Sequence, residues 1–385
     1  DATAIIVEAA GVLTTVSNSG VIRADAAGSG SSANAIIVQS GSLTSFTNTG
    51  DVLALIRDGS TGSSTALDVR TSVNDIAFSN SGTITGDIYL GDGSDTFISS
   101  SGSITGEITL AGGNDSVILS DTTVSGSFLF TTGNKIASMT NTTLKGGFVE
   151  TGAVIDLRVT DSDWTITADE GATLRTLDVQ GSSILRVEVD GVNNRAGTIL
   201  ASETATLSDA TTIVPVLRSV IKDQQTFTLV QAGQLNTNIT FDTARTAETS
   251  YMHTTTVVRD LENPNTIFLR VSRRSADDLG LEDNIATFYE SSSAALSQDS
   301  DLFTDLASIT TQSEFESALT QFLPDTSGAI FQSAIDQQNM SLGAINRRLD
   351  RVPAQGFYRD RPTVWLQTMG HYAKRKADEL RPGYS

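Results

Sequence analysis

A stretch that returns at a fixed interval decides the fold. ITGDIYL at residues 84–90 returns as ITGEITL at 104–110, as VSGSFLF at 124–130 and as LKGGF at 144–148. One apolar column at this interval consists of Ile84, Ile104, Val124, Leu144, Trp164 and Ile184. A second column consists of Phe97, Val117, Ala137, Leu157 and Leu177. Two independent columns at one interval predict that equivalent residues stack on one another, about 4.8 Å apart.

A longer repeat of about 31 residues precedes the 20-residue one. Three segments that begin at Ala4, Ala35 and Ala66 each end in Asn-Ser-Gly or Asn-Thr-Gly, which is a turn signal. Both repeats predict a mainly β fold, a right-handed parallel β-helix (solenoid) over residues 1–214, with coils of about 31 and then 20 residues. An antiparallel Ser/Thr-rich sandwich is the alternative, but sandwiches rarely keep so strict an interval.

The amino-acid composition excludes several classes of function. The chain has 385 residues, with 25 Lys and Arg against 45 Asp and Glu, and a net charge of −20. Nucleic acid is therefore not an expected partner, because phosphate binding needs a cationic surface. The absence of cysteine excludes disulfides, thiolate metal sites and a cysteine nucleophile. No apolar run is long enough for a membrane-spanning helix.

The pattern changes after the repeats. Residues 215–275 keep the alternation of apolar and polar residues that is typical of β-strands, but they lose the 20-residue interval. This predicts a β region that caps the open edge of the solenoid. Helical spacing follows and predicts a helical linker over 276–325 and a longer helix over 326–352. The alternating stretch TVWLQTMGHY at 363–372, within 353–385, has the length of one strand of an outer-membrane barrel.

In this order the parts resemble a type V autotransporter: a β-helical passenger, a capping autochaperone region, a linker helix and the start of a translocator barrel. The resemblance rests on architecture and on short motifs, namely the column Gly86, Gly106 and Gly126, QTFTLV at 225–230, FLP at 322–324, NRRLDR at 346–351 and VWLQ at 364–367. It implies that the 326–352 helix lies in the barrel lumen. It also implies further barrel strands, which this sequence does not contain.

The resemblance also sets the functional expectations. We expect a structural or adhesive module at the cell surface or outer membrane of a Gram-negative bacterium, or one released outside the cell. The expected partners are the outer membrane, through the C-terminal barrel, and molecules on host cells, neighbouring cells or the matrix. Two alternatives remain: a secreted hydrolase that acts on polysaccharides, and a subunit of a self-associating surface filament.

Two acidic turns are candidates for a metal site. GDGSD at 91–95 and GGND at 112–115 are similar to the calcium-binding Gly-Gly-x-Gly-x-Asp nonapeptide. If calcium is a cofactor, its ligands are expected to be Asp92, Asp95, Asn114 and Asp115. Solvated turn residues are the competing interpretation, and no other cofactor is indicated.

Candidates for catalysis are few, and we do not expect an enzyme. The chain has two histidines, His253 and His371, and a Ser-His-Asp triad could use only His253. Asp87 and Glu107 are predicted to lie one coil apart on the outer face, where a pair of carboxyl groups could cleave a polysaccharide. The resemblance also implies a self-processing site at Asn346, because some autotransporters cleave themselves inside the barrel by cyclisation of an asparagine side chain; the competing interpretation is an ordinary helical residue.

Overall fold

The computed structural model describes most of the chain up to residue 322. The described residues are 1–57, 61–219, 221, 224–239, 250–260, 262–296, 300–322, 338, 339 and 342. The chain divides into two units, Asp1–Ala318 and Leu319–Ser385. The first unit contains all the described strands.

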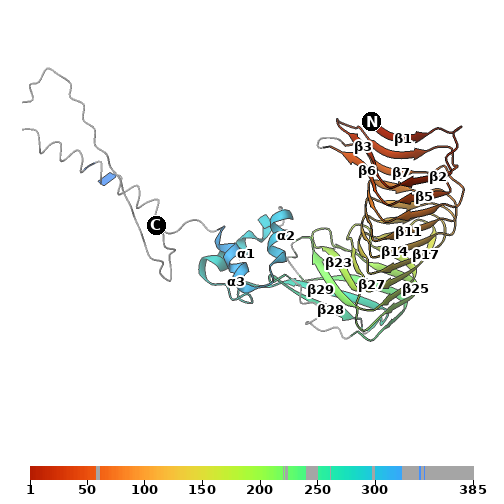
Figure 1. Cartoon of the computed structure of the whole chain (residues 1–385). Helices are drawn as coiled ribbons and strands as arrows, with labels where there is room; N and C mark the ends of the chain where they lie inside the picture. Colours follow the sequence, from red (N-terminus) through yellow and green to blue (C-terminus); the bar gives the residue numbers. More distant parts are fainter. Residues whose placement is uncertain are drawn as a thin grey trace, which may run out of the picture. The chain divides into compact units, whose positions relative to one another are not determined.

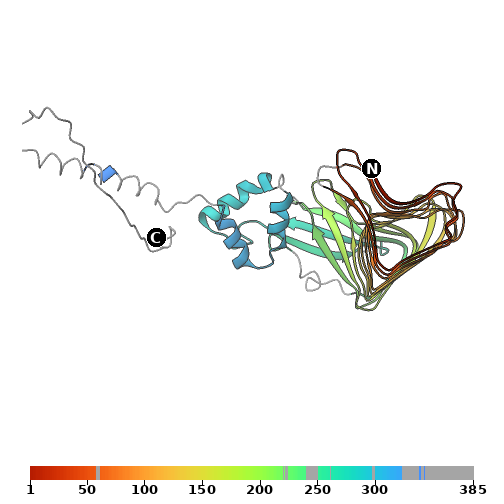
Figure 2. The same cartoon turned by 45° about the horizontal axis from the view of Figure 1, so that its top comes forward.

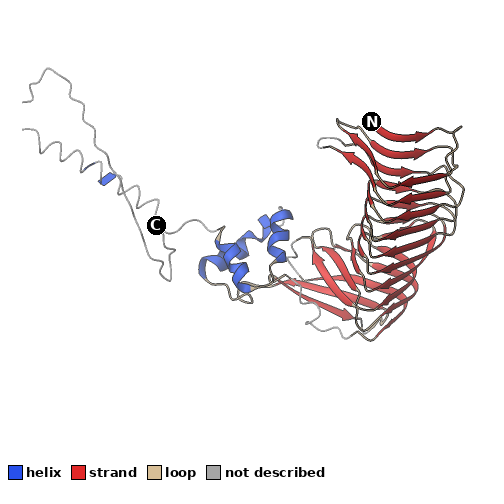
Figure 3. Cartoon of the chain, in the orientation of Figure 1, coloured by secondary structure: helices blue, strands red, loops and turns tan. Residues whose placement is uncertain are grey.

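The first unit is mainly β, with long parallel sheets and few helices (Figure 3). Its strands form a 19-stranded and a 10-stranded sheet. Strands separated by one repeat are parallel neighbours, so that the sheets grow in chain order from β1 onward (Figures 1 and 2). They fall into three columns, and each repeat supplies one strand to each column over most of the region.

The first column contains the strands that open each repeat. Every neighbouring pair in it is parallel. Its members are β1 (Ala2–Val7), β4 (Ala33–Val38), β7 (Ser64–Asp68), β10 (Asp87–Tyr89), β13 (Ile108–Leu110), β16 (Phe128–Phe130), β19 (Phe148–Glu150), β22 (Ala172–Gln180), β25 (Ile199–Leu207) and β27 (Gln225–Thr237).

The second column follows one turn later in each repeat and merges with the first at β22, which pairs with both β19 and β20. Its strands are also parallel. They are β2 (Thr15–Asn18), β5 (Ser45–Asn48), β8 (Ala77–Asn80), β11 (Thr96–Ser100), β14 (Ser116–Ser120), β17 (Gly133–Thr140) and β20 (Ala153–Thr160).

The third column is the 10-stranded sheet. Its neighbours are parallel, except that the short β24 (Arg195–Ala196) lies antiparallel to β23. The other members are β3 (Val21–Ala26), β6 (Asp51–Ile56), β9 (Thr83–Thr85), β12 (Ser103–Thr105), β15 (Thr123–Ser125), β18 (Thr143–Lys145), β21 (Asp163–Ile166), β23 (Ile184–Asp190) and β26 (Thr212–Leu217).

The predicted apolar columns lie in register, with one exception. Ile84, Ile104, Val124, Leu144 and Trp164 are successive partners, and each is at most 1% exposed. The other apolar set of side chains runs along the strands from β11 to β22 and is likewise a series of direct partners: Phe97, Val117, Ala137, Leu157 and Leu177. Matching side chains therefore stack along the interior, as the interval predicts.

The exception is Ile184, whose assignment to the column is wrong. Trp164 pairs with Leu185, and Ile184 pairs with Asp163. The turn from β22 to β23 has three residues, 181–183, where the preceding turn from β20 to β21 has two, 161 and 162. The extra residue shifts the register by one and reverses which side chain points inward. Leu185 is consequently buried and Ile184 is half-buried.

The predicted boundary at residue 214 cuts through a strand. Pro215 lies inside β26, opposite Val187 of β23. Proline is tolerated there because β26 pairs only with β23 among the described residues, and an edge strand needs no N–H on its open side. Parallel pairing also continues to β27, so in the 19-stranded sheet antiparallel pairing begins only with β28 (His253–Arg259) and β29 (Thr266–Arg273).

Helices follow the strands, as the spacing predicts for residues 276–325. They are α1 (Asp283–Leu296), α2 (Ser300–Ser308) and α3 (Gln312–Thr320). Within the described part of the chain, none of the helices combines the length and the apolar character that crossing a membrane requires. The predicted segments 326–352 and 353–385 lie outside the described residues, apart from residues 338, 339 and 342, and so does Asn346.

Candidate functional site

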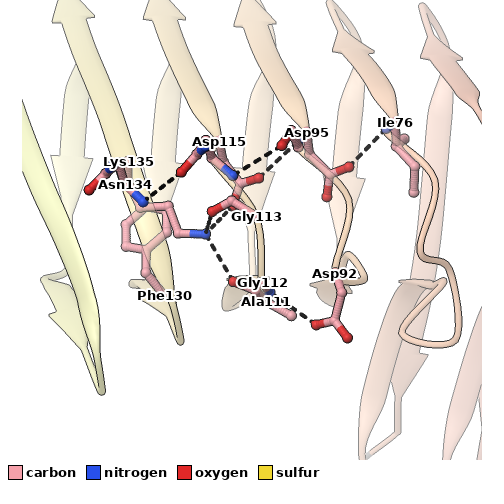
Figure 4. Close-up of polar contacts among 12 residues, drawn as sticks. Ile76, Asp92, Asp95, Ala111, Gly112, Gly113, Asp115, Phe130, Asn134 and Lys135 are labelled. Atoms are coloured by element: carbon pink, nitrogen blue, oxygen red, sulfur yellow. Dashed lines mark hydrogen bonds and ion pairs between the residues drawn. The ribbon is translucent and has the colours of Figure 1, made fainter.

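The predicted calcium turns stack one repeat apart and form a line of aspartates (Figure 4). Asp115 Oδ1 accepts a hydrogen bond of 2.8 Å from the backbone N–H of Asp95. Asp95 Oδ1 in turn accepts one of 2.8 Å from the N–H of Ile76. Both side chains are buried, Asp95 at 1% and Asp115 at 2% exposure, so they are not solvated turn residues.

Lys135 completes this line, and the sequence reasoning missed it. Its Nζ lies 2.5 Å from Asp115 Oδ2, and neither side chain has exposed surface. The ammonium also donates to the carbonyl oxygens of Ala111, at 2.9 Å, and Gly113, at 3.0 Å. The signal was present, because residues 95, 115 and 135 follow the 20-residue interval and a lysine stands where aspartate precedes it twice.

Burial dominates the electrostatics of the cluster Asp95, Asp115 and Lys135. It raises the pKa of Asp95 to about 7, with the nearby Asp115 adding to the shift. Asp95 Oδ2 has no hydrogen-bond partner in the described part of the structure. Burial also raises the pKa of Asp115, although the hydrogen bonds from Lys135 and from the Asp95 N–H oppose the shift.

The four predicted calcium ligands do not converge. Asp92 Oδ1 accepts the N–H of Gly112 at 3.1 Å, and Asn114 Oδ1 accepts the N–H of Asn134 at 3.0 Å. Asp115 is paired with Lys135. Across the residues that the structure describes, no group of three His, Asp or Glu side chains is arranged to hold a metal ion. Calcium therefore stays a prediction from the sequence pattern.

A second polar site is a pocket of about 290 Å³. It lies at the corner where the chain passes from the third column to the first, and its lining includes Glu107, Ser127, Lys145, Glu170 and Arg218. In each of three successive repeats, the connection at this corner has two residues. Between β21 and β22 the connection has five residues, 167–171. The longer connection brings Glu170 back over the preceding repeats, where Ser127 Oγ donates a hydrogen bond to its Oε2.

Glycine permits this close approach. A Cβ on Gly147 would lie 2.2 Å from the carbonyl oxygen of Gly171 and 3.3 Å from the Cβ of Glu170. The backbone N–H of Gly147 donates a hydrogen bond of 2.8 Å to Ser127 Oγ. The serine thus connects the backbone of the next repeat to the carboxylate of the folded-back connection.

Carboxyl groups dominate the pocket. Burial raises the pKa of Glu107, and the neighbouring Asp87 and Glu170 raise it further because a second negative charge is unfavourable there. Asp87 and Glu107 lie in successive repeats, as predicted, and Asp87 Oδ1 accepts the Glu107 N–H at 2.9 Å. Arg218 supplies positive charge and pairs with Asp169 and Glu188. The pocket therefore holds a carboxyl, Glu107, that retains its proton more readily than an exposed glutamate does.

His253, the one triad candidate, is a buried residue of β28. Its Nδ1 lies 3.3 Å from Ser250 Oγ, and it pairs across the sheet with Arg273. Burial and the charge of Arg273 lower its pKa to about 4, so the ring is neutral at pH 7. These surroundings indicate that His253 helps to pack the antiparallel strands.

Comparisons with known proteins do not identify the chain. No known family, no curated protein and no solved structure matches it. The functional proposals below therefore depend on the chain's own geometry and on the resemblance described above.

Proposed function

We propose that the region from β1 to β27 is a right-handed parallel β-helix that serves as the passenger of a type V autotransporter. In this proposal it is a structural or adhesive module at the bacterial surface, or one released from it. The supporting observation is the parallel register, which continues from one repeat to the next from β1 to β27. Such stacking lets each added repeat bury the inward face of the one before it, so the region can form stepwise after export.

The surface chemistry is consistent with a module that works by contact along its length. Charged residues make up only 18% of the chain, and the net charge of −20 keeps it soluble and limits non-specific association with acidic surfaces. The outward positions of the strands carry many Ser and Thr side chains, for example in β2, β5 and β14. Hydroxyl groups at regular spacing suit recognition of glycans or proteins through many weak hydrogen bonds.

Protease accessibility tests the location. Intact cells that express the full gene are treated with proteinase K, with a periplasmic protein as the internal control. The proposal expects loss of the chain while the periplasmic control survives. Survival of the chain until the cells are lysed would overturn it.

Immobilised full chain is then tested for attachment of cells, with the heat-unfolded chain as the control.

The corner pocket favours a second candidate, a hydrolase that acts on polysaccharides. Glycosidases use one carboxyl with a raised pKa as general acid and a second carboxylate as base or nucleophile. Glu107 and Glu170 face the same pocket and are electrostatically coupled. In this candidate, Glu107 is the acid.

A glycan panel separates the two functions. Reducing ends released by the purified full chain are compared with those released by E107Q and E170Q, with E203Q at an exposed position of β25 as the matched control. Hydrolysis that both pocket variants lose and the control keeps supports the enzyme. Equal release by all four proteins would exclude this pocket as the site of hydrolysis, and release by none of them leaves the contact module as the proposal.

A further inference from the structure

The buried pair of Lys135 and Asp115 has the arrangement of two groups poised to condense. We propose that Lys135 Nζ and Asp115 Cγ form an intramolecular amide (isopeptide) bond that ties adjacent repeats together covalently. The bond joins β17 to the residue immediately before β14, between parallel strands that are already in register. It goes beyond the proposed function and does not depend on it.

Proximity is the first support. The two side chains meet at 2.5 Å between Nζ and Oδ2 without exposed surface, so the amine and the carboxyl carbon are within van der Waals reach. Lys135 lies in β17 and Asp115 directly precedes β14, which pairs with β17 in parallel, and two backbone carbonyls hold the nitrogen in place. Such fixed juxtaposition gives effective concentrations far above those of free reactants, on the order of 10⁵ M or more in well-oriented cases.

Exclusion of water is the second support. Burial raises the pKa of Asp115 and so favours its protonated form, which is the form that can lose water. The ring of Phe130 lies near the ammonium, with its centroid 6.0 Å from Nζ, and adds an apolar wall. A site without bulk water also favours loss of water over hydrolysis of the product.

The step balances without an added reagent. A proton passes from the Lys135 ammonium to Asp115 Oδ2, and the resulting amine attacks Cγ. The Nζ–Cγ bond forms, the Cγ–Oδ2 bond breaks, and Oδ2 leaves as water with a second proton from Nζ. The Asp95 N–H donates to Asp115 Oδ1 at 2.8 Å and stabilises the negative charge that develops there. The product is a neutral amide, whose remaining N–H can donate to one of the two carbonyls.

The carboxyl of Asp95 is the neighbouring buried acid, and it interacts electrostatically with both partners. We assign it a positioning role: it influences which protonation state the pair adopts. The variant D95N keeps the backbone N–H and removes only the titratable group, and D121N, at an exposed position in the turn after β14, is its control. The expected result is slower accumulation of the cross-link in D95N than in D121N at equal circular dichroism. Equal rates would remove Asp95 from this role.

Trypsin digestion of the unfolded full chain tests the bond itself. Arg70 and Lys135 are consecutive trypsin sites, and Lys145 is the next. An amide on Lys135 blocks cleavage there, so the expected product is the fragment 71–145 with a mass one water below that of its sequence. A fragment 71–135 of full mass would overturn the proposal. A fragment 71–135 lighter by one water would overturn it as well, because that product is a succinimide with Lys135 still free.

Two lysine variants complete the test. K135R keeps the positive charge and a trypsin site but cannot form the amide, so its intact mass should equal that of its sequence. K145R, at an exposed position, should keep the deficit of one water. A deficit that persists in K135R would assign the lost water to another site and overturn the proposal.

Discussion

At the scale of single residues, one glycine column shows why the repeat is so strict. Gly86, Gly106, Gly126 and Gly146 all have positive φ angles, between 117° and 156°. They occupy the tight corner between the third and first columns, where the last three each face the carbonyl of the glycine one repeat before and Gly86 faces the backbone nitrogen of Ala66. A Cβ on Gly126 would lie 1.9 Å from the carbonyl oxygen of Gly106. Only glycine meets both requirements, because it lacks the Cβ.

Substitution in this column should therefore be costly. We expect G126A to lower the free energy of unfolding by about 1–3 kcal/mol, because the backbone strain and the contact with Gly106 act together. The matched control is G20A, since a Cβ on Gly20 meets nothing within 4 Å and its φ is not positive. Denaturant unfolding measures both. Equal stability of the two variants would contradict the steric explanation.

His253 predicts a dependence of stability on pH. Its pKa is about 4 in the folded chain against 6.5 when unperturbed, because burial disfavours the charged ring. Above pH 6.5 the ring is neutral in both states. Between pH 6.5 and 4 only the unfolded chain takes up the proton, so this residue destabilises the fold as the pH falls. Thermal unfolding should show that the stability of the wild type relative to H253Q falls from pH 7 to pH 4; a constant difference would refute the assignment.

At the scale of the elements, a ladder of buried polar side chains connects the second-column strands. Asn18 donates to Asn48 Oδ1 at 2.8 Å, and Asn48 donates to Asn80 Oδ1 at 2.8 Å. Asn80 then donates to Ser99 Oγ at 3.3 Å. The same asparagines bond to carbonyls of the turn that follows, so they fix where each strand of β2, β5 and β8 ends.

Removing one member of the ladder leaves its neighbours without partners. N48A should lower the free energy of unfolding by about 1–3 kcal/mol, because Asn48 is fully buried and the groups it serves lose their hydrogen bonds. T47A, on the same strand but half-buried, is the control and should change stability by less than about 0.5 kcal/mol. Chemical denaturation measures the difference, and a loss in N48A no larger than in the control would show that the ladder is not stabilising.

At the scale of the whole first unit, the antiparallel strands complete the end of the larger sheet. β27 is parallel to β25 on one side and antiparallel to β29 on the other, and β28 pairs with β29. Without this hairpin, β27 would present a row of unpaired N–H and C=O groups. Open edges of this kind promote association between chains.

Deletion of residues 250–275 from the full chain tests this role. The expected result is a less cooperative unfolding transition and association that increases with protein concentration, because the edge of β27 becomes available for pairing. Size-exclusion chromatography at several concentrations and the denaturant m value are the measurements, with the intact chain as reference. A monomeric deletion variant with unchanged cooperativity would contradict a capping role.

The sequence by itself determined the interval, the parallel neighbours and most of the buried column, because periodicity resides in the order of side-chain types. Only the tertiary structure decided where the interval slips: the three-residue turn before β23 places Leu185, and not Ile184, next to Trp164. Tertiary structure also decided that Lys135 neutralises Asp115 and that Glu170 folds back over Gly147. These outcomes depend on turn length and depth of burial, which are settled only when neighbouring repeats pack against one another.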